Sequence, residues 1–136
     1  MITEDQRKKV VEWVKALRGG TYKQAREFLK NDVGFCCLGV ACDLSGLSEW
    51  EHIEYVDPAG PGQKAITYLG SKSYIPALVS RMFGLSIENE AGVWETNDDL
   101  IHRLIHLNDG DEDTEPVGFD KIADVIEAEL VHATAE

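Results

Sequence analysis

Two adjacent cysteines, Cys36 and Cys37, are the residues of this 136-residue chain with the most evident chemical potential. They stand where a helix is predicted to begin, and the positive end of a helix dipole favours the thiolate form of cysteine. A thiolate nucleophile also needs a histidine base within hydrogen-bond reach. His52, at the start of a predicted strand, is the candidate for that base. The sequence therefore permits a cysteine hydrolase that uses Cys36 or Cys37 with His52.

The same stretch more strongly favours a structural role for these thiols. Residues 34–46 carry a single charge. Their apolar residues recur at helical spacing, at Cys37, Val40, Ala41 and Leu44. A helix that is apolar all round is normally buried, and free cysteines are among the most often buried residues. We therefore predict a central buried helix with Cys37 in the core, with Gly39 allowing close approach of another element and Gly46 ending the helix.

Carboxylates near the C-terminus form the second candidate group. Asp109, Asp111 and Asp113 match the first three ligand positions of a calcium-binding loop between two helices. Thr114 stands where that loop needs glycine, and Asp120 stands where it needs a bidentate glutamate, so a dedicated calcium site is not expected. The predicted contacts for a host protein or a small ligand are Asp109, Asp111, Glu112 and Asp113, together with Lys64 beside a predicted hairpin tip.

His102 and His106 have the i, i+4 spacing that places two histidines on one helix face, where a zinc ion can bridge them. No glutamate occupies the second position of this motif, so the metalloprotease signature is absent. A solvated polar face is the favoured interpretation. The sequence also lacks a nucleotide-binding glycine loop that leads into a helix, and neither a metal nor a cofactor is expected.

Charge is distributed unevenly along the chain, whose net charge is −12. Residues 1–87 have a balance of +1, whereas residues 88–136 carry 2 basic and 15 acidic side chains. This sign opposes direct binding of nucleic-acid phosphates and is compatible with a basic partner or with simple solubility. Three cysteines, no basic and apolar leader and no membrane-length apolar run indicate reduced thiols and a cytoplasmic protein. The sequence does not indicate an oligomeric state.

The elements that must position these residues are predicted from periodicity and capping signals. Thr3 and Gln6 form a capping box for a first helix that ends at Gly19. Further helices are predicted over residues 22–30, 76–83, 98–108 and 119–130, a β-hairpin over 52–56 and 64–69, and a loop over 85–94. For residues 22–30, pairing as an extended strand is the alternative. The chain is thus expected to be a single α+β domain spanning residues 1–136, mostly helical with a small β-hairpin.

Two blocks of the sequence resemble a family of small bacteriophage and bacterial proteins without an assigned activity. The first block includes Trp13, Tyr22, Gln24 and the run Cys36-Cys37-Leu38-Gly39-Val40, and the second includes Leu107-Asn108-Asp109 and residues 122–127. The resemblance implies a phage accessory protein, a class that often binds host components. The leading hypothesis is therefore a non-enzymatic binding or inhibitor protein that meets a host component through its acidic C-terminal half or its hairpin loop. The cysteine hydrolase is the alternative.

Overall fold

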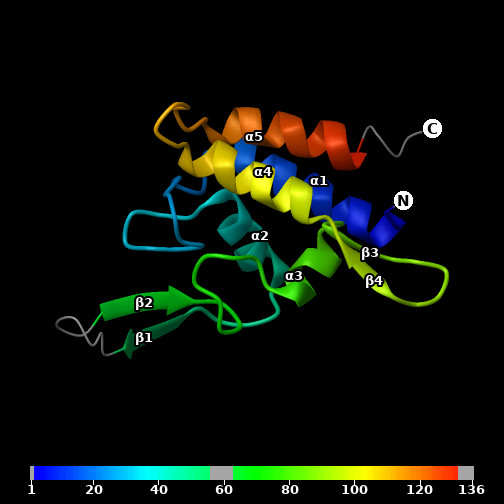
Figure 1. Cartoon of the computed structure of the whole chain (residues 1–136), viewed down its shortest axis with the longest axis horizontal. Coiled ribbons are helices and arrows are strands. Elements are labelled where there is room, and N and C mark those ends of the chain that lie inside the picture. Colours follow the sequence, from blue (N-terminus) through cyan, green and yellow to red (C-terminus); the bar gives the residue numbers. More distant parts are fainter. Residues whose placement is uncertain (1, 56–62, 132–136) are drawn as a thin grey trace.

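A computed structural model describes residues 2–55 and 63–131 and shows an α+β fold (Figure 1). The helices are α1 (Glu4–Arg18), α2 (Cys37–Ser45), α3 (Ala77–Met82), α4 (Asp98–Asp109) and α5 (Phe119–Ile126), and a π-helical turn, η1 (Glu127–Val131), follows α5. The strands are β1 (Glu51–Tyr55), β2 (Gln63–Thr67), β3 (Ser86–Glu88) and β4 (Trp94–Thr96).

The helices make the body of the molecule and the two hairpins extend from it. Helix α5 packs on α1 and α4, and α2 lies beneath them in contact with both α1 and α4 (Figure 1). The antiparallel pairs β1–β2 and β3–β4 project from opposite ends of this body (Figure 1). None of the helices in the described ranges combines the length and the apolar character needed to cross a lipid bilayer.

Helix α1 forms as its capping signals predict. The Thr3 hydroxyl accepts from the N–H of Gln6, and the Gln6 side chain accepts from the N–H of Thr3. One stripe of the helix is buried, at Val10, Trp13, Val14 and Leu17. The stripe packs on α2, where the Trp13 indole N–H donates to the carbonyl of Cys37 at 2.9 Å. The predicted packing of the first helix on the cysteine helix is confirmed.

Helix α2 is the buried centre of the fold, and Cys37 is a core residue with no exposed surface. Gly46 ends the helix in the left-handed region with a φ of 65°, as predicted. Gly39 packs against the backbone of Leu29 so closely that an added Cβ would overlap the Leu29 carbonyl. Close approach is therefore the reason for a glycine in the middle of this helix.

The helix predicted over residues 22–30 is wrong, and the structure agrees better with the alternative of extended pairing. This segment instead pairs its backbone with Phe35, through bridges at Gln24 and Lys30. The N–H of Ala25 donates to the Phe35 carbonyl at 2.8 Å, and the N–H of Phe35 donates to the Lys23 carbonyl at 2.8 Å. These long-range bonds take the donors and acceptors that a helix would use, so the local pattern is overridden.

The loop predicted over residues 85–94 is also wrong, because β3 and β4 pair there with Ser86 opposite Thr96. The β1–β2 hairpin is confirmed, with His52 opposite Ile66. Its expected tip, residues 57–63, lies outside the described residues except for its last member, which opens β2. The predicted last helix is present, but it changes from α to π geometry at Glu127.

Candidate functional site

The two candidate nucleophiles are both buried at the start of α2. Cys36 is the N-cap residue, and its sulfur accepts from the N–H of Gly39 at 3.4 Å. The Cys37 thiol lies 3.7 Å from the Leu104 carbonyl, to which it donates. Burial raises the pKa of Cys36 to about 11 and raises the pKa of Cys37 well above its ordinary value. Both residues are therefore neutral thiols at physiological pH.

His52 occupies a different part of the molecule from these thiols. It is exposed on β1, the strand that follows the opposite end of α2 from Cys37. Cys37 has no exposed surface and Cys36 only 7%, whereas the His52 side chain is exposed on the hairpin. Within the described residues, no histidine hydrogen-bonds to the sulfur of Cys36 or Cys37. This geometry does not favour the hydrolase, which stays an alternative tested by thiol reactivity below.

Asn108 is a polar residue whose role we did not predict, and it joins three segments beside Cys37. Its side chain is buried at the end of α4. The amide oxygen accepts from the N–H of Cys37 at 3.2 Å and from the side chain of Gln24 at 3.1 Å, and the amide nitrogen donates to the Ala25 carbonyl at 2.8 Å. A sequence signal existed, because Asn108 continues the buried Leu104 side of α4 at i+4 spacing.

Replacing Asn108 with alanine is expected to cost about 2–4 kcal/mol of unfolding free energy, because the buried groups of Cys37 and Ala25 lose their partner. Chemical denaturation measures this loss. Asn89→Ala is the matched control, because the Asn89 side chain also makes two hydrogen bonds to backbone groups but lies at a partly exposed turn. Equal losses in the two variants would contradict the role assigned to Asn108.

The acidic loop uses its carboxylates for local structure. Asp109 Oδ1 accepts from the N–H of Glu27 at 2.9 Å. Asp111 Oδ1 accepts from the N–H groups of Asp113 and Thr114 at 2.8 and 2.7 Å, and these bonds lower the pKa of Asp111. The described part of the chain contains no group of three or more potential ligands placed to hold a metal ion.

The two histidines of α4 have separate neighbours. The His102 ring lies 6.0 Å from the Tyr74 ring, and His106 Nε2 lies 3.4 Å from Asp111 Oδ2. Both side chains are exposed. They form part of the solvated face that the sequence favours.

A groove of about 520 Å³ runs between the β1–β2 hairpin and the segment 28–32. We call it the hairpin groove, and its lining consists of Phe28, Lys30, Asn31, Asp32, His52, Ile53, Glu54, Lys64, Ala65 and Ile66. The groove brings together His52, predicted as the base of a thiol enzyme, and Lys64, predicted as a binding residue at the hairpin tip. Phe28 and Ile53 expose 37% and 41% of their surface, and both line this groove.

The hairpin groove exists because only the inner end of the hairpin packs on the body. Trp50 and Tyr68 contact each other there with ring centroids 4.9 Å apart, and Trp50 also meets the Phe35 ring at 5.7 Å. The Lys30 ammonium lies over both the Phe35 and Trp50 rings, at 5.0 and 5.4 Å from their centroids. Beyond this aromatic contact the two strands extend away from the helices (Figure 1). Residues of β1, β2 and the segment 28–32 line the groove.

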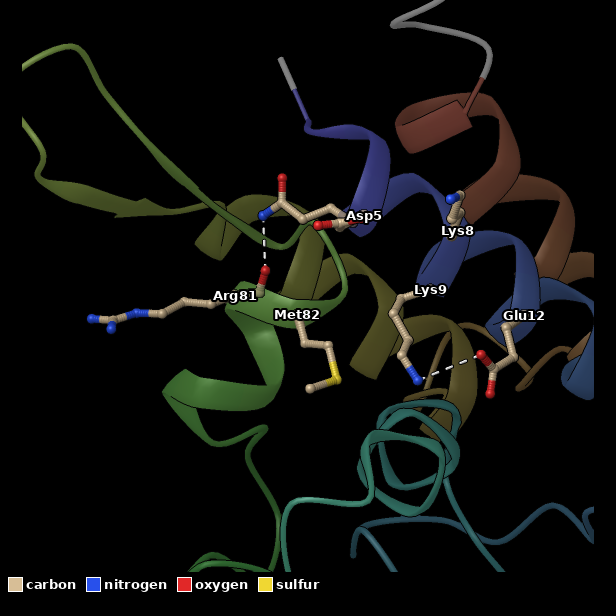
Figure 2. Close-up of a pocket in the computed structure, with 7 residues that line it drawn as sticks. Asp5, Lys8, Lys9, Glu12, Arg81 and Met82 are labelled. Carbon is tan, nitrogen blue, oxygen red and sulfur yellow. Dashed lines mark hydrogen bonds and ion pairs between the residues drawn. The ribbon is translucent and has the colours of Figure 1, made fainter.

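A second groove, of about 540 Å³, lies between α1 and α3 (Figure 2). Three of its charged groups, Lys9, Glu12 and Arg81, have partners within the protein. Lys9 pairs with Glu12 at 3.5 Å, and the Gln6 side chain donates to the Arg81 carbonyl at 2.8 Å. The Arg81 guanidinium turns away from this groove toward the ring of Trp94, 5.0 Å from its centroid (Figure 2). The hairpin groove, with its exposed apolar side chains, is the better candidate for a binding site.

The described residues form an α+β body with buried thiols and an open groove beside a hairpin. The chain belongs to the family described as a domain of unknown function (DUF8296), whose model matches residues 5–130. Neither a curated protein nor a solved structure matches the chain. The family assignment agrees with the resemblance to a family without an assigned activity.

Proposed function

We propose that this chain is a non-enzymatic binding protein of the phage accessory type, which acts in the cytoplasm by holding a host protein in the hairpin groove. The observation that carries the proposal is the groove itself, where Phe28 and Ile53 remain exposed between two walls of the protein. Clustered apolar side chains with a polar rim are typical of protein interaction sites.

The charge of the hairpin groove supports a partner held by shape and apolar contact. The groove carries two lysines, Lys30 and Lys64, and two carboxylates, Asp32 and Glu54. These charges balance, although the whole chain has a net charge of −12. Binding in this groove therefore predicts weak salt dependence, whereas binding through the acidic C-terminal half predicts steep salt dependence.

The acidic C-terminal half is the less favoured binding surface because several of its carboxylates already have partners in the fold. Asp124 and Glu127 pair with Arg18 at 2.6 and 3.2 Å. Asp111 caps its own loop. These contacts give the acidic half a structural use that needs no partner.

Site-specific crosslinking tests the proposal. A photo-reactive benzoylphenylalanine at position 28 is expected to capture one discrete host protein from lysate, while the same group at Val93 is not. Val93 is a suitable control because it is 55% exposed on the β3–β4 hairpin at the opposite end of the body (Figure 1).

The captured protein is then purified and titrated against the full chain. Lys64→Glu, which unbalances the groove, is expected to weaken this binding about tenfold, equivalent to about 1.4 kcal/mol. Glu112→Lys, a charge reversal in the acidic loop, is expected to leave the affinity unchanged. If Glu112→Lys weakened binding while Lys64→Glu did not, and if the affinity depended steeply on salt, the binding surface would lie on the acidic half and the groove assignment would be overturned.

A further inference from the structure

The outer edge of β1 supports an inference that does not depend on the proposed function. In the described residues, β1 and β2 form a sheet of two strands. Strand β1 lies farther from the helices than β2 (Figure 1), and residues 51–54 are all exposed, whereas Thr67 at the end of β2 is buried. Alternate N–H and C=O groups of β1 point away from β2, so this edge can accept another strand.

We propose that the partner of this edge is β1 of a second copy of the chain, paired antiparallel about a two-fold axis at Ile53. The two hairpins then form one continuous sheet of four strands. A sheet of that size is more stable than an isolated hairpin, which is marginal in water. The interface is self-complementary, as a two-fold dimer requires.

Hydrogen-bond complementarity selects this register, because an imidazole N–H can donate to a carboxylate. With Ile53 opposite Ile53, each His52 faces Glu54 of the second copy, and Glu51 faces Tyr55. Because the two residues of an antiparallel pair point their backbone groups either both toward or both away from each other, the neighbouring registers are shifted by whole two-residue steps. One of these shifts places His52 opposite His52, and the other places Glu54 opposite Glu54. The first shift removes the pairing of imidazole with carboxylate, and the second places two carboxylates opposite each other, which is destabilising.

The apolar contribution comes from Ile53, which is 41% exposed in the single chain and meets its own copy in the dimer. A five-residue strand pair buries less surface than a stable permanent interface, so the dimer should dissociate in the micromolar range or above. The two-fold axis is perpendicular to the sheet, so the hairpin grooves of both copies open on the same face.

Sedimentation velocity of the full chain, from micromolar to millimolar concentration, tests this dimer. The sedimentation coefficient of the wild-type chain is expected to rise with protein concentration toward the value for a dimer. His52→Glu places like charges opposite Glu54 and is expected to abolish the rise, whereas the exchanged double variant His52→Glu/Glu54→His is expected to restore it. His102→Glu adds the same charge on α4 and should behave as wild type. A wild-type monomer at every concentration, or an exchanged variant that fails to recover, would overturn the proposal.

Disulfide trapping tests the register. Directly opposite residues have Cβ atoms about 4.5–5.5 Å apart, so Ile53→Cys is expected to crosslink two copies rapidly under mild oxidation. Glu51→Cys lies opposite Tyr55 and not opposite itself, so it should crosslink far more slowly. Equal rates for the two variants would contradict pairing centred on Ile53.

Discussion

Replacing Gly39 with alanine is expected to lower the free energy of unfolding by more than about 4 kcal/mol, which places the change among exceptionally damaging substitutions. The added Cβ would overlap the carbonyl group of Leu29, and that obstacle is backbone rather than a flexible side chain. The segment containing Leu29 would have to move away from α2. Because Leu29 is fully buried, that movement would open the core.

Gly118→Ala is the matched control for this change. Gly118 caps the start of α5, and nothing lies within 4 Å of the position that its Cβ would take. Its replacement should cost less than about 1 kcal/mol. Urea denaturation followed by circular dichroism compares the two variants, and similar midpoints would contradict the close packing of α2 on Leu29.

Alkaline pH is expected to destabilise the protein steeply. Burial raises the pKa of all three thiols, Cys36, Cys37 and Cys42, above the ordinary value of 9.0. At a pH between the pKa of a thiol in the unfolded chain and its pKa in the folded chain, the native chain keeps a proton that the unfolded chain releases. The contribution of the thiols to the free energy of unfolding is therefore fully present below pH 9 and is lost as pH rises. Each thiol contributes at most about 1.4 kcal/mol per pH unit, and this limit applies once the unfolded thiol is fully ionised, so three thiols remove about 3 kcal/mol between about pH 9 and pH 10.

Urea denaturation under reducing conditions at a series of pH values measures this slope. Cys36→Ala provides the comparison, because it removes one thiol and should reduce the slope by about one third. For Cys36 the loss should extend to about pH 11, the folded pKa of that thiol. A free energy of unfolding that stays constant from pH 8 to pH 10 would contradict the burial of the thiols.

The elements that were predicted correctly are those whose signals lie within their own residues. The capping box at Thr3 and Gln6 and the left-handed Gly46 act locally, and both were found as expected. Residues 22–30 were mispredicted because their backbone bonds go to Phe35, whose place is set by tertiary packing. The β3–β4 pair was missed because three-residue strands carry too little alternation to recognise.

The candidate site was harder to predict than the helices. The sequence placed Cys37 correctly in the core, but it gave no indication that Asn108 would bond to its backbone. It identified His52 and Lys64 without showing that they line one groove. That groove depends on how far the hairpin overhangs the segment 28–32, and such an arrangement is set by contacts distant in sequence.

The central claim is that the cysteine helix is the core of a binding scaffold and not the site of a nucleophile. Alkylation of the native protein at neutral pH, followed by mass measurement, tests it most directly. We expect that Cys36, Cys37 and Cys42 stay unmodified while the protein is folded and that all three react once it is denatured without reductant. Rapid labelling of Cys36 or Cys37 in the native protein would contradict the account and favour the thiol enzyme.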